Sequence, residues 1–149
     1  GVCNGPGSKT RLANCVLWGN RDRGGVDESA QIDATRSDQT MIISHSCIQA
    51  WSGQLGGDGN LGLNPLLADP NGADGTMGTL DDNLMLGPDS PCRDAGDNSS
   101  LPRDTPDLDG DGDPNEPIPF DLEGRPRLEN GRVDIGAYEG NSPASGGRP

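Results

Sequence analysis

The sequence predicts an all-β fold made of short strands around a thin, linear core. Only 30% of the residues are hydrophobic and 3% are aromatic, while Gly (24 residues) and Pro (13 residues) are abundant. No segment shows an apolar period of 3.6 residues over ten or more positions, so very little helix is expected. Short apolar clusters of β-type residues, together with two tryptophans and four cysteines, argue against a disordered chain.

The expected strands are separated by turn-rich stretches in which glycine and proline indicate loops. The strand candidates are residues 12–18, 31–33, 41–43, 47–48 and 84–86. From residue 52 onward the chain is richer in glycine, and residues 64–70 form an apolar patch flanked by turns.

A weak internal repeat indicates how the first strands are arranged. Asn14–Leu17 and Ser46–Gln49 both place Cys before a β-branched residue, and each is followed by a nearby Trp. The interval from Cys15 to Cys47 is one long turn of chain that contains short strand candidates. This spacing suits successive rungs of a parallel β-helix more than a hairpin meander, with an irregular sandwich as the alternative.

The cysteines are widely spread and include no Cys-x-x-Cys pair, so a zinc site is not expected. Cys3, Cys15, Cys47 and Cys92 allow three disulfide pairings. In a β-helix, Cys15 and Cys47 would stack in adjacent rungs about 4.8 Å apart, within disulfide reach. A ladder of buried free thiols fits the same pattern.

The net charge of −13 at pH 7 argues against nucleic acid and anionic membrane surfaces as partners, because both would be repelled. No apolar run approaches membrane-spanning length, so membrane insertion is not expected. The numbering starts at Gly1 without a signal peptide or initiator Met, and we expect a mature chain or a fragment of a longer secreted protein.

An acidic loop at residues 107–116 is the strongest candidate site. Its carboxylates would repel one another unless a cation neutralised them: Asp107, Asp109, Asp111, Asp113 and Glu116. Gly110 and Gly112 permit the positive-φ path along which alternate side chains converge. Oxygen ligands at this density favour calcium over zinc or copper. A solvated acidic loop without metal is the alternative.

The loop matches the EF-hand pattern at its first, third, fifth and sixth positions, but the twelfth position is Ile118 instead of a bidentate Glu. Prolines on both sides argue against flanking helices. The loop therefore resembles the short calcium loops of extracellular repeat modules, with Glu116 or Asp121 completing the shell.

Several motifs follow one another between Leu12 and Glu139 in a recognisable order. They are Asn14-Cys-Val-Leu-Trp-Gly-Asn20, Ser46-Cys-Ile-Gln49, Gly59-Asn60 with Asn64-Pro65-Leu66, Leu86-Gly-Pro-Asp-Ser-Pro-Cys-Arg-Asp-Ala-Gly96, Asp121-Leu-Glu-Gly-Arg-Pro-Arg127 and Val133-Asp-Ile-Gly-Ala-Tyr-Glu139. This order resembles the C-terminal region of bacterial right-handed parallel β-helix (pectin-lyase-like) surface proteins. The last part is similar to a choice-of-anchor Q domain, and Val133–Glu139 is its most specific piece.

The resemblance implies a secreted or cell-surface protein whose residues 1–51 are the terminal rungs of a right-handed parallel β-helix. Residues 52–140 would then form a loop-rich cap stabilised by calcium, and residues 141–149 a linker or frayed tail. A sorting signal often follows the closing motif in such proteins. Residues 140–149 contain no LPxTG-type or hydrophobic anchor, so we expect that part to be missing or processed.

Ion pairs are expected to hold the closing motif together. Arginine offers a planar fork suited to carboxylates, so Arg127 is expected to pair with Asp94 or Asp134, with Asp121 in the same network. Polysaccharide lyases of this fold use calcium and an Arg or Lys base, but residues of a terminal cap favour a structural role. No catalytic residue is assigned, and the single histidine, His45, argues against a catalytic triad.

Together these features predict a non-catalytic structural or adhesive module, secreted or at the cell surface. It would self-associate or dock on upstream rungs through its open first rung. Trp18 and Trp51 could stack on sugars, which makes surface polysaccharide a candidate partner, or could pack at rung edges. The alternatives are the C-terminal end of a polysaccharide lyase or other carbohydrate-active β-helix protein, and a calcium-dependent carbohydrate-binding domain.

Overall fold

The computed structural model describes residues 1–3, 5–34 and 40–140, in which strands predominate over short helices. The elements are β1 (Val2–Cys3), β2 (Lys9–Ala13), β3 (Val16–Leu17), α1 (Glu28–Gln31), β4 (Ile32–Asp33), β5 (Thr40–Ser44), β6 (Cys47–Ile48), β7 (Leu67–Asp69), β8 (Asn83–Leu86) and the 3-10 turns η1 (Asn98–Ser100) and η2 (Glu129–Gly131). The prediction of a mainly β chain with little helix is confirmed. The sheets are small.

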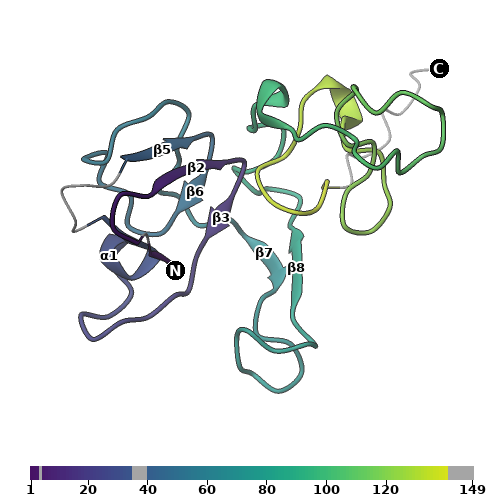
Figure 1. Cartoon of the computed structure of the whole chain (residues 1–149). Helices are drawn as coiled ribbons and strands as arrows, with labels where there is room; N and C mark the ends of the chain where they lie inside the picture. The colour runs from purple at the N-terminus through teal and green to yellow at the C-terminus, as the bar shows by residue number, and fades with distance from the viewer. Residues whose placement is uncertain (4, 35–39, 141–149) are drawn as a thin grey trace.

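Three of the sheets are parallel pairs formed by two consecutive stretches of chain (Figure 1). β1 pairs with β4, β2 with β5 and β3 with β6, while β7 and β8 form an antiparallel pair. The register sets Val2 opposite Ile32 and Lys9 opposite Thr40, so the offset along the chain is nearly the same in both pairs. Strands β1–β3 and β4–β6 therefore follow the same course side by side.

The register differs by one position from the predicted repeat. Val16 lies opposite Cys47, so Cys15 is not aligned with Cys47. Successive residues of a strand point to opposite faces, and a shift of one position therefore exchanges the faces. Cys15 packs against the cluster that contains Ile48, whereas Cys47 belongs to the cluster on the other side. The expected stacking of Cys15 on Cys47 is wrong.

The same tight bend recurs at three levels of the chain. Asn14 lies between β2 and β3 with φ of 55°, and His45 lies between β5 and β6 with φ of 44°. A parallel bridge joins Cys47 to Leu61, and just before Leu61 the chain bends again at Gly59, with φ of 70°. Left-handed backbone is uncommon outside glycine, so its recurrence at equivalent positions is a structural repeat.

The core consists of two buried clusters that share strand β6. The first contains Leu17, Ile32, Ile43 and Ile48, and the second contains Cys47, Leu86, Cys92 and Ile135. Because Cys47 and Ile48 are adjacent, β6 presents one side chain to each cluster. The second cluster fastens the later part of the chain to the outer side of the paired strands.

The C-terminal half is loop-rich, as expected, and it contacts the β2–β3 bend. Gly136 N donates to Asn14 O at 3.0 Å, and the Asn14 side chain accepts from Asp97 N at 2.7 Å. The closing motif at Val133–Glu139 forms bends and contains no strand. Its backbone hydrogen bonds go to separate partners, such as Ile135 N to Cys92 O at 2.8 Å, and no ladder can form.

We expect Gly57→Ala to destabilise the paired strands far more than Gly53→Ala. Both glycines have positive φ, at 96° and 79°. A Cβ on Gly57 would lie 1.8 Å from Ile43 O, whereas nothing lies within 4 Å of one on Gly53. The left-handed backbone should cost each alanine variant about 1 kcal/mol of the free energy of unfolding. The clash with Ile43 O should bring the total loss in Gly57→Ala to about 3 kcal/mol or more. Urea unfolding followed by circular dichroism measures both values, and equal losses would contradict the close approach.

Candidate metal centre

The acidic loop is shaped by its own aspartates. Asp109 Oδ1 accepts from Asp111 N at 3.2 Å, and Asp111 Oδ1 accepts from Asp113 N at 2.7 Å. Asp107 has φ of 72° and accepts from Gly110 N and Gly112 N at 3.0 and 3.2 Å. Gly110 and Gly112 have positive φ, as the sequence predicts. Aspartates bonded in this way favour turns over strands or helices.

Two groups of carboxylates converge within this loop. Asp104, Asp107 and Asp109 form one group, and Asp109, Asp111 and Glu116 form the other. Within each group the potential ligand atoms all lie within 4.8 Å of one another. Oxygens that bind one divalent cation must lie within a few ångströms of one another. Each group is therefore close enough to share one cation, and Asp109 belongs to both.

Asp104 is the residue that sequence reasoning missed. It is 0% exposed, and Oδ2 accepts from Leu108 N at 2.8 Å, but Oδ1 is buried without a hydrogen-bond partner among the described residues. An unpaired buried carboxylate oxygen is costly unless a cation or a hydrogen bond satisfies it. A metal ion held between Asp104 and Asp107 would satisfy this atom. The signal in the sequence was only that Asp104 continues the acidic run in the N-terminal direction.

The loop concentrates negative charge, and the arginine next to it in the chain does not balance that charge. Burial raises the pKa of Glu116, and the charges of Asp111, Asp109, Asp113 and Asp104 raise it further. Glu116 Oε1 is also buried, and no part of the described chain donates to it. Arg103 donates to Asn115 Oδ1 at 2.7 Å rather than to a carboxylate. This donor set of crowded oxygens fits a hard divalent cation.

The structure separates the predicted metal ligands into two classes. Asp107, Asp109, Asp111 and Glu116 belong to the converging groups, whereas Asp113 belongs to neither and accepts from Asn115 N at 3.0 Å. Asp121, considered as a completing ligand, uses its carboxylate elsewhere. Its Oδ2 accepts from Glu139 N at 2.8 Å, and its Oδ1 accepts from two further backbone N–H groups.

The closing motif contains a second buried cluster of charge. Arg127 Nη1 lies 2.8 Å from Glu139 Oε1, and both side chains are almost fully buried. Arg127 Nη2 also donates to Gly136 O at 2.6 Å. The expected pairing of Arg127 with Asp94 or Asp134 is wrong, because Glu139 is its partner. The sequence does not rank these three carboxylates, since Asp94 belongs to one of the motifs and Asp134 and Glu139 to another.

The other predicted ion-pair residues bind backbone groups. Asp134 Oδ1 accepts from Asp94 N and Oδ2 from Gly140 N, both at 2.6 Å. Burial raises the pKa of Asp134, and these two donors oppose that effect. Burial also acts to raise the pKa of Asp121, but its donors from Glu139, Arg125 and Glu123 lower it overall. Both carboxylates thus organise loops, which is a structural role.

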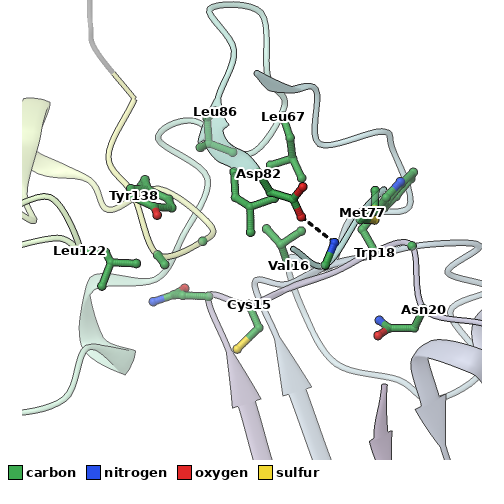
Figure 2. Close-up of a pocket in the computed structure, with 16 residues that line it drawn as sticks. Cys15, Val16, Trp18, Asn20, Leu67, Met77, Asp82, Leu86, Leu122 and Tyr138 are labelled. Atoms are coloured by element: carbon green, nitrogen blue, oxygen red, sulfur yellow. Dashed lines mark hydrogen bonds between the residues drawn. The ribbon is translucent and has the colours of Figure 1, made fainter. Parts of the chain in front are cut away.

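The two tryptophans lie in different places. Trp51 packs against the cluster that contains Ile48, and Trp18 packs against the cluster that contains Cys47. Trp18 lines a cavity of about 680 Å³ between β3, the β7–β8 hairpin and the closing motif (Figure 2). Met77 also lines the cavity, close to Gly19, and Tyr138 lies on the far side of the cavity from Trp18. Trp51 is not among the cavity residues, so the two rings form no common platform there.

Comparisons with known proteins found no matching family model, no matching curated protein and no matching solved structure. Among the described residues, no helix is long and apolar enough to cross a membrane.

The buried Glu139 gives a prediction about pH. Burial, followed by the charge of Asp134, raises its pKa from 4.5 to about 7, although Arg127 opposes the shift. Between these pH values the folded chain holds a proton that the unfolded chain has released. The free energy of unfolding should therefore fall as pH rises from about 4.5 to 7, by on the order of 3 kcal/mol.

Glu139→Gln should flatten this decline, because the amide oxygen keeps an acceptor for Asp134 N without titrating. Glu123→Gln, which removes an exposed carboxylate of the same region, is the control and should leave the slope unchanged. Urea unfolding at pH 5, 6, 7 and 8 with chelator present measures the slopes. An unaltered slope in Glu139→Gln would show that another group titrates.

Proposed function

We propose that this chain is a non-catalytic structural or adhesive module of a secreted or cell-surface protein, built on terminal rungs of a right-handed parallel β-helix and stabilised by calcium. The observation that carries the proposal is the nearly equal offset of the three parallel strand pairs, in which Val2 lies opposite Ile32, Lys9 opposite Thr40 and Val16 opposite Cys47. Two successive rungs with three strands each would produce three parallel pairs whose offsets along the chain are nearly equal.

Further contacts support a coil that continues past the second rung. Leu61 N donates to Ser46 O, and Ile48 N donates to Leu61 O, both at 2.8 Å. The chain from Cys47 to Leu61 is much shorter than the chain from Val16 to Cys47, so this third rung is shortened. The bends at Asn14, His45 and Gly59 recur in step with the pairing. A rung that shortens in this way suits the end of a β-helix.

The opposite side of the coil supports attachment to another chain segment. In the part of the chain that the structure describes, each parallel sheet has two strands, so β1, β2 and β3 are edge strands. Edge strands present backbone groups that template further pairing. An upstream rung or a second copy of this chain would cover them, as the sequence predicts.

Calcium binding is supported by the two carboxylate groups and by the unpaired oxygens of Asp104 and Glu116. A cation there would fix residues 104–116 and relieve the repulsion that raises the pKa of Glu116. In the described chain the helical elements nearest to the loop are the short 3-10 turns η1, which ends at Ser100, and η2, which begins at Glu129. No helix that could move therefore flanks the loop directly among the described residues. Calcium would therefore act on stability.

Calcium should bind the chain and raise its unfolding temperature. A ligand at 100 times its dissociation constant adds about 2.7 kcal/mol to the free energy of unfolding. Asp109→Asn should weaken calcium binding at least about tenfold, because Asp109 belongs to both carboxylate groups. Isothermal titration calorimetry and thermal unfolding with and without calcium measure these effects.

Asp113→Asn is the matched control, since it removes the same charge from the same loop but belongs to neither group. It should reduce affinity only a few-fold, through the weakened electrostatic attraction. Equal losses in the two variants would mean that the loop attracts cations without coordinating them. No heat and no thermal shift at millimolar calcium would refute the calcium site.

Self-association should depend on the outer edge of β2. Ser8 O accepts from Thr40 N, so the backbone groups of Ser8 point toward β5. In a parallel pair every second residue points its backbone groups toward the same neighbouring strand. Arg11, three positions after Ser8, therefore points its backbone groups away from β5. Sedimentation velocity should show larger species as concentration rises. Arg11→Pro, which removes the outward N–H, should abolish them, whereas Arg11→Ala should not. Association that is equal in both variants would assign the contact to another surface.

The carbohydrate-related alternatives remain predictions. A polysaccharide lyase would release an unsaturated product with ultraviolet absorbance from uronic-acid polymers. A carbohydrate-binding domain would use the cavity at Trp18, whose lining includes Asn14, Asn20 and Asp82 as polar groups. Asp82 already accepts from Gly78 N (Figure 2). The apolar majority of the lining favours packing over sugar recognition.

A further inference from the structure

The sequence allows three disulfide pairings, and the structure distinguishes between them. Cys47 and Cys92 are both 0% exposed and belong to one buried cluster with Leu86 and Ile135. In the structure both thiols are free, and the Cys47 thiol donates to Leu63 O at 3.2 Å. Each of the two thiols also shifts the pKa of the other, which agrees with their place in one cluster. Cys15 instead donates to Ala13 O at 3.1 Å and packs in the other cluster, and the exposed Cys3 donates to Asp33 Oδ2 at 3.5 Å.

We propose that Cys47 and Cys92 form a disulfide that fastens the loop-rich part of the chain to strand β6. The sequence alone suggested Cys15 as the neighbour of Cys47, but the strand register places these two side chains on opposite faces. The inference depends on this register and on the shared cluster, and it stands whether or not the loop binds calcium.

Both cysteine backbones are fixed, which leaves the thiols little freedom to separate. Cys47 N donates to Cys15 O, and Cys92 O accepts from Ile135 N, both at 2.8 Å. Cys92 N donates to Ser90 Oγ at 3.2 Å, and Ser90 Oγ donates to Pro65 O at 2.6 Å. A disulfide needs two Cβ atoms about 3.5–4.5 Å apart and an S–S bond of about 2.05 Å. The proposal therefore requires that the two anchored backbones hold the Cβ atoms within this range.

The bond forms by exchange with a disulfide oxidant, either a low-molecular-weight disulfide or an oxidised dithiol protein. The thiolate of one cysteine attacks the oxidant and releases one thiol, which leaves a mixed disulfide. The second cysteine then attacks that bond and releases the other thiol. Two S–H bonds of the chain are lost and one S–S bond is gained, and two electrons and two protons pass to the oxidant.

The burial of the thiols indicates when these steps take place, because the thiolate that attacks must reach the oxidant. Full burial excludes the oxidant from the finished fold, so the exchange takes place before the second cluster closes over β6.

The test is peptide mapping of the chain refolded with oxidised and reduced glutathione and then alkylated under denaturing conditions. Trypsin leaves both cysteines on one peptide, residues 37–93, because that stretch contains Lys or Arg only at its last position. A second digestion at aspartates such as Asp58 and Asp69 separates them unless the disulfide joins them. We expect two of the four thiols to resist alkylation and the Cys47 and Cys92 fragments to remain linked.

Cys15→Ser should retain this link, and Cys92→Ser should leave its three remaining thiols free for alkylation. Reduction of the wild-type chain should lower the unfolding temperature by about 5–10 °C, as expected for a bridge that closes a loop of this length. Four alkylated thiols, or a link through Cys3 or Cys15, would overturn the proposal. Mapping of the wild-type chain decides the pairing even if a variant fails to fold.

Discussion

The parallel pairing of β3 with β6 is the contact on which both parts of this molecule depend. β6 is only a short strand, Cys47–Ile48, yet its backbone bonds to β3 on one side and to Leu61 on the other. Its side chains enter both core clusters, with Ile48 among the paired strands and Cys47 under the loop-rich half. Because the side-chain period of a strand is two, the register of this short pair decides which residues form each cluster.

The loop-rich half has few strands, so polar contacts replace sheet ladders. The carboxylates of Asp121 and Asp134 accept hydrogen bonds from backbone N–H groups of several loops. Arg127 and Glu139 form a buried ion pair. Buried charges of this kind are tolerated only when their partners are in place. Burial and the charge of Asp134 raise the pKa of Glu139, while Arg127 opposes this shift.

The acidic loop follows a different principle from the closing motif. In the closing motif, arginine and backbone donors are supplied by the chain itself. In residues 104–116 the carboxylates converge, and the buried oxygens of Asp104 and Glu116 find no donor within the described chain. The cation that we propose would supply positive charge to this loop. In the closing motif Arg127 already supplies it.

The sequence by itself determined the all-β class, the low helix content and the positions of most strands. Alternating aspartates and glycines also located the candidate metal loop, because side-chain chemistry and glycine's backbone freedom are local properties. Only the tertiary structure decided the partners. The register shift that separates Cys15 from Cys47, the choice of Glu139 for Arg127 and the convergence of Asp104 with Asp107 all join segments through the fold. Local sequence cannot rank such pairs, because several chemically equivalent residues are available and packing alone selects among them.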